Sequence, residues 1–217
     1  MKKFLVLFAV LILTASIVSA GNLGLYGTPE GNWKFVGNRL YQNDEKAPRA
    51  KAWLMVPQNG AMVYEFTIRY EGGGEDGHGG IGIHILSDNI PKGKSWGFGN
   101  SVLFWLNYDE NPKSADIPKG LSAEIYKSTN NSKMELCGQA YSINEYMPVL
   151  LKYLSSDIPV KITYLASKGR FLIDDPSGMT AGWYVDIPGM KNVSGKYIAV
   201  RTNGIAASFT SPDVSLP

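Results

Sequence analysis

This sequence has a single cysteine and almost no excess of basic over acidic residues, and each of these shortages excludes a class of protein. Cys137 is the only cysteine, so an internal disulfide cannot form and a disulfide scaffold is excluded. A lone cysteine is typical of a buried, inert thiol, and no neighbouring residue supplies a base that would activate it. The basic residues are scattered rather than clustered, which excludes the positive footprint of a nucleic-acid-binding protein.

Long hydrophobic runs are absent after the N-terminus. Lys2 and Lys3 precede an apolar stretch over residues 4–13, and residues 18–20 are small, as at a signal-peptidase site. The stretch is shorter than the roughly 20 residues of a membrane span. We therefore predict a signal peptide over residues 1–20, cleavage near Ala20, a secreted or periplasmic location, and no membrane span in the mature protein.

The remaining residues, 21–217, show many short strand patterns separated by turn residues. Residues 62–70 alternate between apolar and mostly polar side chains, and isoleucines alternate with other residues along 81–85. In residues 102–108, Val102, Phe104, Leu106 and Tyr108 alternate with Leu103, Trp105 and Asn107. Ser167-Lys168-Gly169 and Asn203-Gly204 each separate two such segments and predict hairpins. This pattern predicts a single all-β domain built as a sandwich or barrel.

One segment has helical periodicity instead. Ser142 and Glu145 have the spacing of a capping box, and apolar residues follow at helical intervals up to Leu154. We expect one short helix over about residues 143–154.

Strand parity places a set of polar and aromatic residues opposite the apolar face. Sugars are bound by such mixtures, because planar polar groups bind hydroxyls and aromatic rings stack on apolar sugar faces. A solvated sheet face would give the same alternation. The set comprises Glu65, Arg69, His84, Trp105, Asn107, Glu124, Tyr126, Tyr197 and Arg201.

Within this set, we expect Trp105 to stack on a sugar ring. His84, Asn107, Glu65, Arg69, Tyr126 and Arg201 would bind around it. If the chain were instead a glycosidase, Glu65, Glu124 or His84 would be the acid/base candidates. Two carboxyl groups would then have to lie about 5–10 Å apart.

A glycine-rich run, residues 71–84, contains both histidines. Glu75, Asp76 and His78, together with backbone carbonyls, form a weak candidate site for Ca²⁺. The spacing matches neither an EF-hand loop nor a zinc helix motif. The alternative interpretation is a plain connection between two strands.

Several segments resemble the concanavalin A-like lectin/glucanase superfamily. They are Trp33–Gln42, Ala61–Phe66 with the glycine-rich connection into Gly80–Ile83, and Tyr197–Thr202. The resemblance implies a jelly roll of two curved antiparallel sheets with a ligand on the concave face. The Glu-x-Asp-x-x-Glu run of the laminarinase-type members is missing, so no catalytic residues carry over.

We therefore expect an exported, non-catalytic jelly-roll module that binds a carbohydrate or glycan. One alternative is a glycoside hydrolase or lyase-type enzyme acting on polysaccharide. Another is a structural or assembly subunit of the cell envelope or a surface appendage. Without Lys2 and Lys3 the chain is formally neutral, and neutrality together with many aromatic residues favours self-association.

Overall fold

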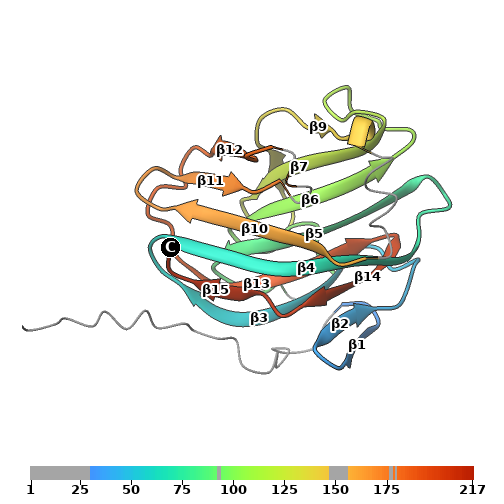
Figure 1. Cartoon of the computed structure of the whole chain (residues 1–217), viewed down its shortest axis with the longest axis horizontal. Helices are drawn as coiled ribbons and strands as arrows, with labels where there is room; N and C mark the ends of the chain where they lie inside the picture. Colours follow the sequence, from blue (N-terminus) through green and yellow to red (C-terminus); the bar gives the residue numbers. More distant parts are fainter. Residues whose placement is uncertain (1–29, 92–93, 147–155, 176–177, 179) are drawn as a thin grey trace, which may run out of the picture.

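A computed structural model describes residues 30–91, 94–146, 156–175, 178 and 180–217. Two antiparallel sheets lie face to face and enclose one hydrophobic core (Figure 1). The predicted all-β jelly-roll sandwich is therefore confirmed.

The first sheet, sheet A, carries the first two strands at one edge and β12 at the other. In spatial order it contains β1 (Trp33–Val36), β2 (Arg39–Gln42), β14 (Ile205–Thr210), β4 (Met62–Gly73), β10 (Ile158–Leu165), β11 (Arg170–Ile173) and β12 (Trp183–Asp186), and β15 (Asp213–Ser215) also pairs with β4.

Sheet B has the β5–β6 hairpin at its centre. In spatial order it contains β3 (Ala50–Gln58), β13 (Gly195–Asn203), β5 (His78–Ser87), β6 (Ser101–Asp109), β7 (Gly120–Ser128) and β8 (Met134–Leu136), and β9 (Tyr141–Ser142) also pairs with β7.

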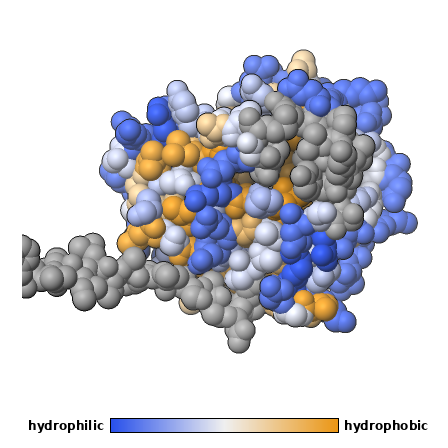
Figure 2. Space-filling view, in the orientation of Figure 1, coloured by the Kyte–Doolittle hydropathy of each residue, from blue (hydrophilic) through white to orange (hydrophobic). Residues whose placement is uncertain are grey.

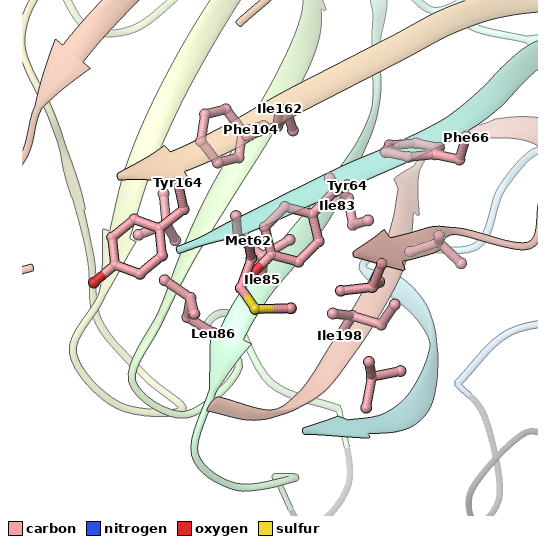
Figure 3. Packing of buried hydrophobic residues seen from close by; sticks show 14 of the residues in the cluster. Met62, Tyr64, Phe66, Ile83, Ile85, Leu86, Phe104, Ile162, Tyr164 and Ile198 are labelled. Carbon is pink, nitrogen blue, oxygen red and sulfur yellow. The ribbon is translucent and has the colours of Figure 1, made fainter. Parts of the chain in front are cut away.

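The core forms where the apolar faces of the two sheets meet. Tyr64 and Phe66 on β4 belong to the same buried cluster as Ile83 on β5 (Figure 3). Phe104 of sheet B packs against Phe171 of sheet A with ring centroids 5.5 Å apart. The alternation read from the sequence thus identified the inward-facing residues correctly, because a strand can bury only one face between two sheets.

The expected helix is described only in part. Asn144–Tyr146 forms a short 3₁₀ helix, η1, directly after β9. Residues 147–155, which make up the rest of the expected segment, lie outside the described residues.

One of the two expected hairpins is wrong. Ser167-Lys168-Gly169 does join the paired strands β10 and β11. Asn203-Gly204 instead joins β13 of sheet B to β14 of sheet A, so the chain changes sheets there. Gly204 has a φ of 65°, which favours glycine and turns the chain sharply, but a turn signal does not specify which sheet the next strand joins.

The surface seen from the side of Figure 1 is mixed in character. Hydrophilic residues cover much of the right-hand part of this view, and hydrophobic residues gather toward the left and centre (Figure 2). Among the described residues, no helix has the length and apolar character needed to cross a membrane.

The amide of Gln58 links the two sheets. Its Oε1 accepts hydrogen bonds from the Tyr64 hydroxyl on sheet A, at 2.9 Å, and from the backbone N–H of Leu86 on sheet B, at 2.7 Å. Its Nε2 donates to the carbonyl oxygens of Val56 and Tyr197. All four bonds involve a fully buried side chain.

We expect Gln58→Leu to lower the free energy of unfolding by about 2–4 kcal/mol, because several buried polar groups would lose their partners. Tyr64→Phe removes only one of these bonds and should cost about 1 kcal/mol. Urea denaturation of both variants measures the difference. Equal costs for the two changes would contradict the linking role of Gln58.

Candidate binding site on the outer face of sheet B

Strand register brings five residues into one row across sheet B. Lys51 on β3 lies opposite Arg201 on β13, which lies opposite Gly82 on β5. Gly82 lies opposite Trp105 on β6, and Trp105 lies opposite Glu124 on β7. All five belong to the face that points away from the core, which we call the outer face of sheet B.

Two further rows flank this one on the same face. The first contains Trp53, Ala199, His84, Leu103 and Tyr126, and the second contains Asn203, Gly80, Asn107 and Ser122. The structure therefore brings together five of the residues predicted from the sequence as ligand contacts, namely Trp105, His84, Asn107, Tyr126 and Arg201.

The outer face of sheet B is concave. Arg201 Nη1 on β13 lies 3.6 Å from Met134 Sδ on β8, although β5, β6 and β7 lie between these strands. In a flat sheet, four strand spacings would separate the two backbones by about 19 Å. The side chains could not span that distance, so the sheet must curve toward its outer face.

Two glycines of the glycine-rich run, which have no side chains, leave room for the Trp105 indole. A Cβ atom at Gly80 would lie 2.0 Å from Trp105 Cζ2, and one at Gly82 would lie 2.9 Å from Trp105 Cε3. The indole therefore lies directly against the β5 backbone, and its Nε1 donates to Asn107 Oδ1 at 3.2 Å. Only 9% of Trp105 is exposed, so the ring expected to stack on a sugar is instead buried in the outer face of sheet B.

His84 is also buried beneath this surface. The Phe98 ring covers it at 5.5 Å, and burial, followed by the charges of Arg201 and Lys51, lowers the pKa of His84 well below its usual value. Arginine can only donate, so its 3.5 Å contact with Nε2 leaves the His84 proton on Nδ1, which donates to Ser101 Oγ at 3.0 Å. His84 thus supports the site as a neutral ring rather than contacting a ligand.

Two cations occupy the centre of the face. Burial, followed by the charge of Arg201, lowers the pKa of Lys51 to about 7. Burial and the nearby Arg49 lower the pKa of Arg201 to about 10. Lys51 Nζ donates to the Ser95 carbonyl oxygen at 2.5 Å and lies 3.6 Å from Glu30 Oε2.

Arg201 lies between two indole rings. Its guanidinium is 5.3 Å from the Trp105 ring centroid and 5.4 Å from that of Trp96, and Arg49 lies 5.8 Å from the Trp96 ring. Arg201 Nη1 also donates to the Trp96 carbonyl oxygen at 2.7 Å. Trp96 remains 48% exposed, so it presents an aromatic surface at this face.

Trp96 was not among the residues predicted from the sequence. It lies in the loop between β5 and β6, outside the strand alternation on which the candidates were chosen. The sequence feature that could have identified it is an aromatic residue between Ser95 and Gly97 in a glycine-rich loop.

Glu124, on β7 at the end of the row, is buried and accepts a hydrogen bond at each of its two carboxylate oxygens. Its Oε1 accepts from Ser122 Oγ at 2.7 Å, and its Oε2 accepts from the Tyr126 hydroxyl at 2.5 Å. Burial and the bond to this carboxylate raise the pKa of Tyr126 above its usual range. Glu124 therefore fixes Tyr126, which is partly exposed.

Two predicted contact residues lie elsewhere. Glu65 and Arg69 are on β4, on the outer face of sheet A, where they form ion pairs with Lys161 at 3.0 Å and Glu71 at 2.7 Å. The expectation of one shared face is wrong, because alternation separates inward from outward residues without showing which sheet a strand joins. Glu65 and Glu124 have the core between them and cannot act as a glycosidase pair.

The glycine-rich connection between β4 and β5 is a tight turn. Gly77 N–H donates to the Gly74 carbonyl oxygen, and Asp76 Oδ1 accepts from the backbone of His78. The His78 ring lies 3.0 Å from Asp109. Among the described residues, no three acidic, histidine or cysteine side chains gather as a metal site would require. Calcium binding through Glu75, Asp76 and His78 stays a prediction.

Cys137 is partly buried against the core. Burial raises the pKa of its thiol, which lowers the fraction of reactive thiolate. This environment agrees with an inert cysteine.

The close packing of Trp105 against Gly80 can be tested by a double-mutant cycle. Gly80→Ala should destabilise the protein by about 1–3 kcal/mol, because the new methyl group overlaps the indole. In a Trp105→Ala background the same change should cost much less, because the overlapping ring is gone. Additive effects in chemical denaturation would show that Gly80 and Trp105 do not touch.

The buried Lys51 predicts a pH dependence of stability. Unfolded lysine keeps its proton up to about pH 10.4, whereas folded Lys51 loses it near pH 7. The unfolded state binds more protons between these values, so the free energy of unfolding should rise there with pH, by at most about 1.4 kcal/mol per unit. Lys51→Met should lack this rise in urea titrations. Parallel curves for the two proteins would contradict a lowered pKa.

Comparisons with known proteins give similarity in structure only. No protein-family model and no curated protein matches the sequence. The CBM2 module of the evolved Dit of Lactobacillus casei BL23 phage J-1 superposes with a TM-score of 0.53 at 9% identity, covering 86% of this chain and 81% of that one. The legume lectin-like domain from Entamoeba histolytica gives 0.50 at 11%, covering 88% and 89%.

The carbohydrate recognition domain of Emp47p gives a TM-score of 0.50 at 14% identity and covers 87% of each chain. These identities are too low to carry any residue's role from one protein to another. The fold that the resemblance implies is confirmed: the chain is a two-sheet jelly roll similar in fold to these lectin-like domains.

Proposed function

We propose that this chain is an exported, non-catalytic carbohydrate-binding module whose ligand lies on the concave outer face of sheet B, against Trp96. The fold supports this proposal, because structural neighbours include a legume lectin-like domain and a carbohydrate recognition domain. Fold alone does not establish function, so the proposal depends on the site itself.

The observation that carries the proposal is the half-exposed indole of Trp96. Arg49 and Arg201 lie within stacking distance of this ring. The partly exposed amides of Asn107 and Asn203 lie on the same concave face. An aromatic surface among planar polar groups suits the apolar face and the hydroxyls of a sugar.

The geometry gives little support to the enzymatic alternative. A glycosidase requires two carboxyl groups about 5–10 Å apart, and Glu65 and Glu124 lie on opposite faces of the sandwich. His84 is buried and held neutral under Phe98, which removes it from contact with a substrate. We propose binding without turnover.

Export and self-association belong to the proposal as testable parts. N-terminal sequencing of the protein made by its own cells should show cleavage near Ala20. Light scattering across a concentration series distinguishes a monomeric binder from an assembly subunit of the envelope.

Glycan-array screening followed by calorimetry tests the site. We expect Trp96→Ala to weaken binding by about tenfold or more, or about 1.4 kcal/mol, because the sugar loses its stacking partner. Trp183→Ala is the matched control, since Trp183 is 43% exposed but lies on β12 of sheet A. Binding that survives Trp96→Ala, or that is lost in Trp183→Ala, would place the ligand elsewhere.

A further inference from the structure

Three basic side chains, Lys51, Arg201 and Arg49, gather on the concave face of sheet B. Lys51 and Arg201 are direct cross-strand neighbours, an arrangement that costs stability for like charges. Arg49 lies close enough to lower the pKa of Arg201. Glu30 is the only carboxylate within 4 Å of any of these three cations among the described residues.

Two other arginine–aromatic stacks in the protein show how this chain normally neutralises such a charge. Arg170 lies 4.1 Å from the Tyr184 ring and forms a two-pronged ion pair with Asp186, both bonds being 2.7 Å. Arg69, stacked on Tyr41, pairs with Glu71 at 2.7 Å. Each of these guanidinium groups has a carboxylate of its own.

The stack on Trp96 lacks that carboxylate. Neither Arg49 nor Arg201 forms an ion pair with any described residue, and Arg201 Nε is a buried donor without a hydrogen-bond partner among them. Arg201 is only 2% exposed, whereas Arg49 is partly exposed. Asn203 Oδ1 accepts the backbone N–H of Arg49 at 3.0 Å, which fixes this residue at the edge of the site.

We propose that the glycan bound on this face is anionic and that a carboxylate or sulfate group on it pairs with Arg49 beside Trp96. Arg201 provides positive charge beneath the ligand, and Trp96 provides the ring on which the sugar lies. This inference rests on the proposed carbohydrate-binding function and specifies its ligand class. Guanidinium binds both acidic groups through paired charge-assisted hydrogen bonds.

Calorimetry with two pairs of polymers tests the inference, each pair sharing a backbone and differing in charge. The pairs are polygalacturonate against its methyl ester, and dextran sulfate against dextran. We expect the acidic member of at least one pair to bind about tenfold or more tightly than its neutral counterpart, the size of effect that a charge-assisted hydrogen bond gives. Higher salt should reduce this preference.

Two variants assign the preference to the site. Arg49→Gln should abolish it, and thermal unfolding checks that the protein still folds. Arg170→Gln is the matched control, because Arg170 also stacks on an aromatic ring but already has Asp186 as its counter-ion. It should leave the preference intact.

Several results would overturn the inference: equal affinity within each pair, a preference that survives Arg49→Gln, or equally tight binding of polyphosphate. Binding of neutral polymer that depends on Trp96 but shows no preference for charge would overturn the anionic ligand and leave the carbohydrate-binding function standing. Absence of binding to every glycan on the array would overturn the carbohydrate-binding function itself.

Discussion

The burial of one guanidinium, that of Arg201, organises the concave face of this protein. Removing a charge from water is costly unless the surroundings compensate for it. Here two indole rings, the carbonyl oxygen of Trp96 and the neutral ring of His84 surround the group. The compensation is incomplete, because no described carboxylate pairs with it.

Other features of the face follow from this arrangement. Trp105 can lie flat beside Arg201 only because glycines at positions 80 and 82 leave room above β5. The loop carrying Trp96 is held down by Ser95, which binds Lys51, and by Phe98, which covers His84. The two outer faces of the sandwich therefore differ in kind. Sheet A carries exposed ion pairs, whereas sheet B carries a buried cationic centre with an exposed ring at its surface.

Much of the fold could be predicted from the sequence, because alternation along a strand reports directly which face meets the core. Met62–Tyr70 and the isoleucines of β5 showed this clearly. Assignment to sheets could not be predicted, because it depends on hydrogen bonding between distant segments. For this reason Glu65 was grouped with Trp105, although their strands belong to different sheets, and Asn203-Gly204 was interpreted as a hairpin.

The site was predicted in part for the same reason. Five of its residues were predicted from strand alternation. Their burial could not be predicted, because the alternation of a strand does not show whether a loop covers it. Trp105 and His84 proved to be buried supports. Trp96, the exposed ring, lies in a loop where strand periodicity carries no information.

The ligand is proposed to lie against Trp96 on the concave face. This placement can be followed in an NMR titration through the indole N–H signals of the five tryptophans. On addition of an acidic oligosaccharide such as trigalacturonate, we expect the signals of Trp96 and of the adjoining Trp105 to shift while that of Trp183 stays in place. A shift at Trp183 with Trp96 unchanged would contradict this placement.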